Sequence, residues 1–490
     1  MVYLLRLFVK KTIIVSNTKT IFGKNEIVFT FFRYLTYGIQ TTRGLILAYF
    51  LGPYFLGIYG YLMLYQQYLS YTNLGLNYSV NSELSLLKNG DSDERMKIIN
   101  SSFSGVLIIS MVLCLVAILF YFLRVQLFPF RDSHKYIFVI LILTILTHFQ
   151  QIFINIFRID KKLKPIIVGE LILSSGLLIV VPFFKGIDLV NAVFYVWVLI
   201  LFGVVCLYRI VYGKKIAWET TKFKILLKSG IPLLVYAFSY YLMGLMVRTL
   251  IGAFYSVEIM GYFSFANNIT TAVMLGLDTI TWIIFPSVIA KLAIGNLDND
   301  ELCDYLVSFT NNLFVLVTVI VGFSIASLPI LLFFLPKYKP VEFSLIVLLV
   351  NQIIFNSGFV FVSLCIARKM HKEMAVISLL AVGISAIISI FFCFYGFSYI
   401  WLVISNIIGS LCFINGLIYY VSKKFALQQA TLRKSLSWYI QLILCSIILA
   451  TLLKAYWLVL LLLGITLIFK FKSVKDLYVQ LAKVLSNNVR

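Results

Sequence analysis

Long apolar runs separated by short polar breaks dominate the chain from residue 29 onward. Most runs reach about 20 residues, the length that an α-helix needs to cross roughly 30 Å of hydrocarbon. A helix also satisfies its own backbone hydrogen bonds, which the membrane interior requires. We therefore predict an all-α, polytopic membrane protein with 12–14 transmembrane helices, the last two being short. The predicted spans are residues 29–51, 54–78, 103–123, 136–157, 165–184, 187–208, 231–253, 258–283, 306–335, 341–366, 374–395, 398–420, 436–453 and 455–471.

The polar breaks divide these spans into two bundles of six helices, followed by an additional pair. The longest connections are only about twenty residues, so the sequence predicts no soluble domain. The predicted units are an N-terminal tail (1–28), an N-lobe (29–208), a linker (209–230), a C-lobe (231–420), a pair of additional spans (436–471) and a C-terminal tail (472–490).

Charge is distributed unevenly across the predicted membrane. The chain has 490 residues, of which 61% are hydrophobic and 12% charged, with a formal net charge of +22. Of its 41 Lys and Arg residues, 31 fall on the side of the N-terminus, in the tails and loops and, for Lys470, at the end of the last span, against seven on the opposite side. The positive-inside rule therefore places both termini in the cytoplasm. It also accounts for the basic charge without a nucleic-acid partner.

Neither the N-terminal segment nor the cysteines indicate a different class of protein. Residues 1–28 carry five Lys and Arg but no cleavage site of small residues, so we read them as a cytoplasmic tail. The seven cysteines include no Cys-x-x-Cys spacing, and they predict neither a disulfide framework nor a metal site. We expect no cofactor and no catalytic residue.

One stretch of the first half recurs about two hundred residues later. Residues 43–59 and 248–263 each place an arginine in an apolar helix. Leu-Ile and a small residue follow the arginine, and the stretch ends in a turn with Gly57 or Gly261. The segment Leu74-Gly-Leu-Asn77 is matched by Leu275-Gly-Leu-Asp278. The order of these matches indicates two duplicated, pseudo-symmetric halves, an architecture of secondary transporters.

Three arginines lie within predicted spans, namely Arg33, Arg43 and Arg248. A charge at mid-span costs about 2.5–3.5 kcal/mol on insertion scales, so it normally faces a watery cavity or a partner. Because only Glu170 and Asp278 lie clearly within spans as acidic residues, we expect a net-positive cavity that binds an anion. Guanidinium groups suit a diphosphate because their planar fork donates two parallel hydrogen bonds. Snorkelling, or an internal ion pair with either carboxylate, is the alternative.

Polar and tyrosine side chains recur at helical spacing along several spans. Facing a cavity, amides and hydroxyls would bind sugar hydroxyls, and tyrosine rings would stack on sugars. Ordinary hydrogen bonding and packing between helices is the alternative. The candidates are Tyr37, Gln40, Tyr61, Tyr65, His148, Gln151, Asn155, Asn267, Gln352 and Asn356.

The two carboxylates, Asp278 and Glu170, are candidates for coupling transport to an ion. A carboxylate in a low dielectric titrates near neutrality, so either could carry H⁺ or bind Na⁺. Asp278 could instead cap the inner end of its span in contact with solvent.

Several of these features resemble one family. They are the arginine in the first span, the Leu-Gly-x-x-x-x-Gly-x-Tyr turn of residues 51–59, Asn73-Leu-Gly-Leu, Ser229-Gly-Ile-Pro232, and Arg248 followed by Gly261-Tyr262. Over residues 25–425 the chain resembles the Wzx-type polysaccharide flippases of the multidrug/oligosaccharidyl-lipid/polysaccharide (MOP) superfamily. In many relatives an acidic residue precedes the second-half arginine, where this chain has Val247.

The resemblance implies a function and a set of partners. The protein would move an undecaprenyl-diphosphate-linked oligosaccharide, a repeat unit of O-antigen or capsule, from the inner to the outer leaflet. It would use ion-coupled alternating access, with Arg43 and Arg248 as cavity cations, among membrane lipids and together with polysaccharide polymerase or assembly proteins. Spans 436–453 and 455–471 resemble the additional helices of lipid II flippases of the MurJ type.

Other classes remain as alternatives. A MATE-type exporter should carry acidic residues in the first lobe, where this chain has Arg33 and Arg43. A lipid II flippase would share the fold and the lipid anchor. A membrane glycosyltransferase, polymerase or ligase would need a sizeable outer loop with catalytic residues, and the outer loops here are short.

Overall fold

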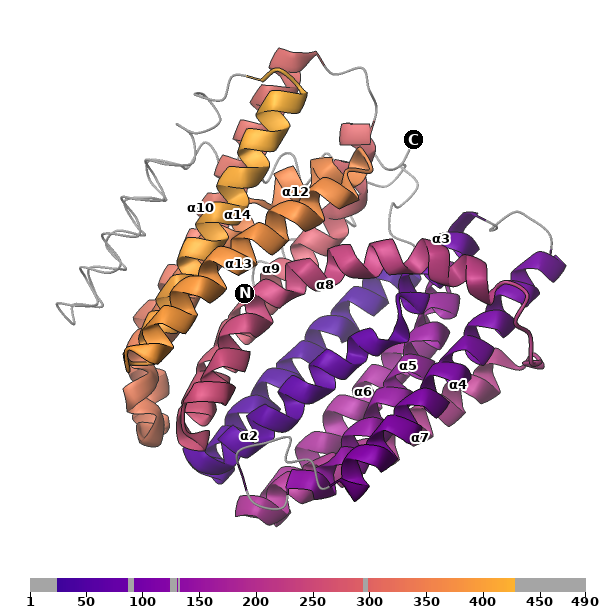
Figure 1. Cartoon of the computed structure of the whole chain (residues 1–490), viewed down its shortest axis with the longest axis horizontal. Helices are drawn as coiled ribbons and strands as arrows, with labels where there is room; N and C mark the ends of the chain where they lie inside the picture. Colours follow the sequence, from indigo (N-terminus) through magenta and orange to yellow (C-terminus); the bar gives the residue numbers. More distant parts are fainter. Residues whose placement is uncertain (1–23, 87–91, 124–129, 131–132, 294–297, 428–490) are drawn as a thin grey trace.

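The computed structural model describes residues 24–86, 92–123, 130, 133–293 and 298–427 (Figure 1). Over these residues the chain is built from helices and contains no strand. Ten of the described helical segments are long and apolar enough to cross a membrane. The predicted all-α, polytopic class is therefore confirmed. The predicted span pair 436–471, the tail 472–490 and residues 1–23 lie outside the described residues.

The first helical element contains two of the predicted spans. Helix α2 (Lys24–Leu69) breaks at Gly52, whose φ of 66° and ψ of 176° are a conformation open essentially to glycine alone. Pro53 follows directly, at the position where a fixed φ suits the first turn of a helix. The chain reverses here, so residues 24–51 and 53–69 form two legs, as the predicted boundary between spans at residues 51–54 required.

The second leg ends earlier than the predicted limit of residue 78. It passes into a 3-10 turn, η1 (Ser70–Asn73), and then into a separate helix, α3 (Leu76–Leu86). The connecting residues Leu74 and Gly75 have φ values of 51° and 81°. The left-handed backbone at this pair ends the span and redirects the chain.

The remaining N-lobe helices overlap the predicted spans, but the first of them begins at Ser92, eleven residues before the predicted start at residue 103. Some of their apolar side chains form a buried cluster with α3, which includes Leu76, Phe153 and Tyr208. The elements are α4 (Ser92–Phe122), η2 (Ser133–Tyr136), α5 (Ile137–Ile159), α6 (Leu163–Val180), η3 (Val181–Phe183) and α7 (Gly186–Tyr212).

The C-lobe also matches the predicted order, with one span divided. The predicted span 341–366 is two helices that meet at Gly358, where the first of them ends. The predicted long span 306–335 lies within one continuous helix. The elements are α8 (Phe223–Phe254), α9 (Val257–Ala293), α10 (Asn299–Phe334), η4 (Pro336–Val341), α11 (Glu342–Ser357), α12 (Phe359–Ala367), α13 (His371–Phe394) and α14 (Ile400–Lys424).

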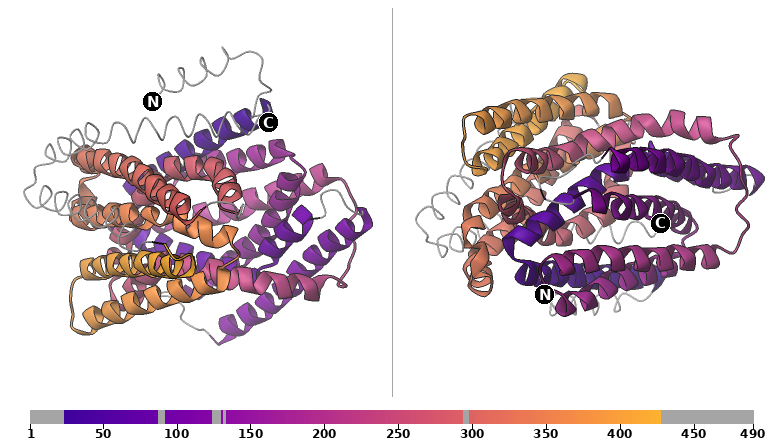
Figure 2. Two further views of the ribbon diagram at one scale, coloured as in Figure 1. Left: turned by 90° about the horizontal axis from the view of Figure 1, so that it is seen from above. Right: turned by 60° about the horizontal axis from the view of Figure 1, so that its bottom comes forward.

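Helix α8 joins the two halves, because its first turns pack on the N-lobe. Figure 1 shows the helix reaching over the end of the N-lobe, and the second view of Figure 2 shows the same crossing. A Cβ added to Gly105 of α4 would meet the Phe223 ring at 2.6 Å, and one added to Gly75 would meet the Gly230 carbonyl oxygen at 2.2 Å. Glycines at these positions therefore allow α8 to approach the N-lobe closely.

The connection between the lobes is shorter than predicted and is fixed to α4. Helix α7 continues to Tyr212 and α8 begins at Phe223, so residues 213–222 replace the predicted linker 209–230. Backbone N–H groups of this segment donate to side chains of α4, from Ala217 to Asn100 at 3.3 Å and from Glu219 to Ser104 at 3.0 Å. Such bonds hold the linker on the cytoplasmic end predicted for the N-lobe.

Candidate functional site

The two lobes meet where the second leg of α2 crosses α9, at Gly57 and Gly261. A Cβ on Gly57 would lie 1.8 Å from the carbonyl oxygen of Val257, and a Cβ on Gly261 would lie 1.7 Å from that of Pro53. Each glycine therefore contacts the carbonyl four residues before the other glycine. This reciprocity is the contact expected at a two-fold axis that relates equivalent residues of two repeats.

Arg248 of α8 lies beside this crossing and is only 5% exposed. Its Nη2 donates to the carbonyl oxygen of Gly60 at 2.9 Å, and its Nη1 donates to Gln67 Oε1 at 3.3 Å. Its Nε is buried without an acceptor. Among the described residues no carboxylate forms an ion pair with Arg248. We call the contact of the second α2 leg (53–69) with α8 and α9 the seam. The seam therefore contains a buried cation held only by neutral oxygen atoms.

Two tyrosines of the same α2 leg reinforce the contact with α8. Tyr61 is buried and donates from its hydroxyl to the carbonyl oxygen of Gly252 at 2.9 Å. The Tyr68 hydroxyl shares a hydrogen bond of 2.5 Å with Thr249 Oγ1. Tyr65 is half-buried against the main apolar core. In this state, Tyr61 joins the lobes and is not free to line a cavity.

Arg43 does not occupy the position equivalent to that of Arg248. It is partly exposed on the first leg of α2 and makes no hydrogen bond or ion pair with the described residues. Arg248 precedes Gly261 by thirteen residues, and counting thirteen back from Gly57 gives Gly44. A one-residue offset turns a side chain about 100° around a helix. The two arginines therefore face different surroundings.

Arg33 lies nearer the start of α2 and forms a polar group with two predicted neighbours. Its Nε donates to the Tyr37 hydroxyl at 2.7 Å, and its guanidinium lies 5.6 Å from the centre of the Tyr37 ring. One turn further on, Gln40 Nε2 donates to Ser174 Oγ of α6 at 3.2 Å. This face of α2 therefore points toward α6.

Both predicted coupling carboxylates lie in the field of Arg33. Its positive charge acts on Glu170 of α6 and on Asp278 of α9. Glu170 is partly buried, whereas Asp278 is exposed. Since α6 belongs to the N-lobe and α9 to the C-lobe, Arg33 interacts electrostatically with one carboxylate on each side of the seam.

Of the predicted polar residues of α5, some contact neighbouring elements and one is exposed. His148 is buried and lies 3.2 Å from Thr72 Oγ1 through its Nε2 atom. Asn155 Nδ2 donates to the carbonyl oxygen of Asn77 at 2.9 Å, whereas Gln151 is exposed. His148 and Asn155 thus contact η1 and the start of α3, respectively.

The predicted C-lobe amides are partly buried. Asn356 Nδ2 donates to the carbonyl oxygen of Gln352 at 2.8 Å and to its side-chain Oε1 at 3.3 Å. The same amide lies 3.9 Å from the Met274 sulfur of α9. Asn267 lies on α9 itself and is half-buried. Asn356 thus brings Gln352 of α11 and Met274 of α9 together.

Sequence reasoning missed the partners that hold Arg248 and the tyrosines in place. Gly60, Gln67 and Thr249 are all within the seam, yet none of them lies on a predicted polar stripe. Gln67 was visible as an amide within a tyrosine-rich span, seven residues after Gly60. The carbonyl of a glycine leaves no signal of this kind, because any residue supplies a carbonyl.

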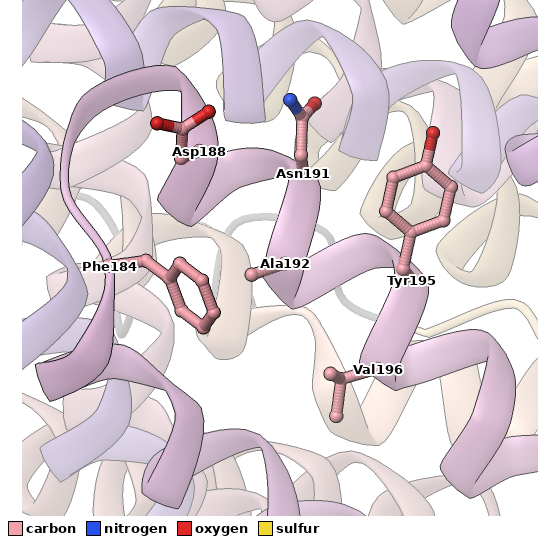
Figure 3. A pocket seen from close by; sticks show the side chains of 6 residues that line it. All are labelled: Phe184, Asp188, Asn191, Ala192, Tyr195 and Val196. Carbon is pink, nitrogen blue, oxygen red and sulfur yellow. The ribbon is translucent and has the colours of Figure 1, made fainter.

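A shallow hollow of about 440 Å³ lies outside the seam, at the start of α7 (Figure 3). Phe184 and Tyr195 border it, with Asp188 and Asn191 beside them. Asn191 Oδ1 accepts a hydrogen bond of 2.5 Å from the Tyr136 hydroxyl. None of the predicted site residues lines this hollow, so it is separate from the group around Arg248.

Solved structures with a similar fold are membrane transporters. A lipid II flippase, MurJ, in an inward closed conformation has a TM-score of 0.66 and 16% identity, covering 92% of this chain and 100% of its own. A multidrug resistance MATE family transporter of the MOP superfamily, in an inward-facing conformation, has a TM-score of 0.64 and 14% identity, covering 83% of this chain and 100% of its own. The comparison with curated protein sequences gives no match.

The chain is therefore a polytopic membrane protein that shares its fold with a transporter described as a member of the MOP superfamily. A family model described as "Polysaccharide biosynthesis protein" matches residues 22–292, which is more than half of the chain. The chain belongs to this polysaccharide biosynthesis family. The predicted resemblance to Wzx-type MOP proteins is confirmed at this level.

Proposed function

We propose that the protein is a flippase that moves an undecaprenyl-diphosphate-linked oligosaccharide repeat unit, of O-antigen or capsule, from the cytoplasmic to the outer leaflet of a bacterial plasma membrane. Membership of the polysaccharide biosynthesis family supports a saccharide cargo. The MurJ neighbour, described as a lipid II flippase, supports a lipid-linked one. Transporter-like folds of this kind support translocation and not catalysis.

Arg248 is the observation that carries the proposal. A buried guanidinium with only neutral acceptors is under-compensated, because hydrogen bonds to charged acceptors are roughly twice as strong as neutral ones. A diphosphate that reached the seam would replace Gly60 and Gln67 with anionic oxygens. Arg43, partly exposed on the other repeat, would supply a second cation once the lobes rearrange.

The glycine crossing supplies the moving contact in this mechanism. With Gly57 and Gly261 in contact, the backbones of α2 and α9 close the seam on the side of the Gly52 turn, which the charge distribution predicts to be outer. Separation of this crossing would withdraw the Gly60 carbonyl from Arg248. Binding of the diphosphate and opening toward the outer leaflet would then be linked through one side chain.

The coupling ion is proposed to act through the carboxylates near Arg33. Asp278 and Glu170 lie on opposite lobes and share its field. Neutralisation of either carboxylate, by H⁺ or by a bound Na⁺, would change the attraction between the lobes at that level. The ion gradient would thereby bias the movement of the lobes.

The proposal is tested by Arg248→Ala and Arg248→Lys in cells that depend on this protein for surface polysaccharide. We expect Arg248→Ala to reduce export by more than about tenfold while lipid-linked saccharide accumulates in the inner leaflet. We expect Arg248→Lys to keep partial export, because it retains the charge without the planar fork. Normal export by Arg248→Ala, at wild-type membrane levels, contradicts the proposal.

A lipid II flippase is the second candidate, since the MurJ neighbour covers 92% of this chain. The two candidates differ in the cargo that accumulates when the protein is depleted. Accumulation of a peptidoglycan precursor favours the second candidate, whereas accumulation of an oligosaccharide repeat unit favours the first. A MATE-type exporter or a membrane glycosyltransferase predicts neither accumulation.

A further inference from the structure

A second hollow lies at the end of the N-lobe where the linker begins, remote from Arg248. It has a volume of about 230 Å³ and is formed between α4, the turn from α5 to α6, and the end of α7. Its lining residues are Arg95, Ile99, Ile156, Phe157, Asp160, Lys162, Tyr212 and Lys214.

The hollow has an apolar floor and a positively charged rim. Its floor includes Ile156 and Phe157, both buried in the N-lobe core. On the rim, the Arg95 guanidinium forms an ion pair with the Asp160 carboxylate, which neutralises the acidic residue. Lys162 and Lys214 are exposed and form no ion pair with the described residues. The rim therefore keeps two uncompensated positive charges.

The backbone fixes the positions of both lysines. Lys161 has a φ of 55°, and the Lys162 N–H donates to the carbonyl oxygen of Phe157 at 2.8 Å, so the α5–α6 turn is tied to α5. Lys214 follows Gly213, which ends α7 with a φ of 69°. Beyond it the linker is hydrogen-bonded to α4, including a bond of 3.2 Å from the Lys222 N–H to Ser101 Oγ.

The surroundings of the hollow place it where a lipid headgroup would lie. Trp218 of the same linker is 62% exposed, and exposed tryptophans are typical of the membrane–water interface. Leu199, Phe202 and Ile210 of α7 are each more than half exposed, so this helix presents an apolar surface to the membrane. A free phosphate ion would make no use of this surface, whereas acyl chains would.

We propose that this hollow binds the phosphate headgroup of an anionic phospholipid of the cytoplasmic leaflet. Lys162 and Lys214 contact the phosphate oxygens, Tyr212 borders the glycerol region, and the acyl chains lie along α7. The site consists of N-lobe residues and Lys214 of the linker, and it does not depend on the proposed flippase activity. A bound lipid would join α4, α5 and α7 at the point where the linker leaves the N-lobe.

The test measures lipid binding to the purified full-length protein by native mass spectrometry, with phosphatidylglycerol, phosphatidylcholine and inorganic phosphate as probes. The variant Lys162→Gln/Lys214→Gln removes both rim charges. Its matched control is Lys161→Gln/Lys215→Gln, which removes two exposed neighbouring lysines that do not line the hollow. At about one factor of five per lysine near a membrane surface, the rim variant should lose about 25-fold in phosphatidylglycerol affinity.

The control variant should stay within about twofold of the wild type, and phosphatidylcholine should bind weakly to all three proteins. Equal losses in both double variants would mean that the charge acts non-specifically, and this result overturns the proposal. An unchanged affinity of the rim variant overturns it as well. Competition by inorganic phosphate at the same concentration as the lipid would identify a free-phosphate site instead.

Discussion

Arg248 combines burial, positive charge and incomplete hydrogen bonding in one side chain. Leaving a buried polar atom such as its Nε without an acceptor costs about 1–3 kcal/mol, and more for a charged group. Such a group persists where another state of the protein, or a ligand, supplies the missing acceptor. This argument is local to the residue and holds whichever saccharide is attached to the lipid.

The sequence alone showed that Arg248 is an unusual residue, but it did not show which residues surround it. An arginine within an apolar span is visible in the sequence, and so is the scarcity of acidic partners. The hydrogen bonds to Gly60 and Gln67 depend on the rotation of α2 relative to α8, which no local pattern encodes. For the same reason, the predicted equivalence of Arg43 did not extend to its contacts.

Asp278 provides a prediction about coupling at the residue scale. Asn has nearly the same shape as Asp but carries no titrating proton, so Asp278→Asn should flatten the dependence of transport on external pH. Glu170→Gln, a change of the other carboxylate near Arg33, gives the comparison. Transport would be measured in vesicles with an imposed pH gradient, and an unchanged pH profile for Asp278→Asn would exclude it as the coupling site.

At the scale of elements, glycines decide where helices break and where they touch. Gly52 allows α2 to reverse, and Gly358 stands where α11 gives way to α12. The first break was predictable because Gly-Pro interrupts an apolar run. The second was not, because the run 341–366 has the ordinary length of one span and contains no proline. The hydrophobic pattern thus located the spans more accurately than the breaks within them.

The glycine crossing gives the prediction at this scale. Gly57→Ala should hold the lobes apart on the predicted outer side, because its Cβ would overlap the Val257 carbonyl, and backbone cannot yield as a side chain can. The matched control is Gly44→Ala on the other leg of α2, where a Cβ meets no atom within 4 Å. We expect Gly57→Ala to lower transport by about tenfold or more and Gly44→Ala to leave it near normal.

The state of the lobes can be measured directly in these variants. Accessibility of a single cysteine near the outer end of the seam to a membrane-impermeant thiol reagent should rise in Gly57→Ala and in Gly261→Ala. It should stay low in Gly44→Ala and in Gly276→Ala, whose added Cβ also meets no neighbouring atom. Equal accessibility in all four variants would show that the crossing does not close the outer side.

For the whole molecule, the division into two lobes was predictable, but the contacts that join the lobes were not. Each of the twelve predicted spans within residues 29–420 has a counterpart among the described helices. The predicted linker 209–230 included the first turns of α8, which are instead helical and pack on the N-lobe through Gly230 and Phe223. Close backbone contact across distant segments sets this arrangement, and hydropathy does not record it.

The orientation in the membrane is a prediction about the whole chain. The charge distribution predicts that the turn at Gly52 and the segment at Lys337 face outward, whereas the linker at Lys215 faces the cytoplasm. Single cysteines at Tyr54 beside this turn, at Lys337 and at Lys215, in an otherwise cysteine-free chain, should be labelled from outside at the first two alone. Labelling of the linker position in intact cells would invert the topology.

The central claim, that the seam around Arg248 binds a lipid-linked diphosphate, is tested most directly by equilibrium binding. The purified protein would be titrated in nanodiscs with an undecaprenyl-diphosphate saccharide and, in parallel, with the monophosphate form of the same lipid. The account predicts that the wild type prefers the diphosphate, and that Arg248→Gln weakens its binding by about tenfold and removes the preference. Equal affinity of the wild type and Arg248→Gln for the diphosphate would contradict it.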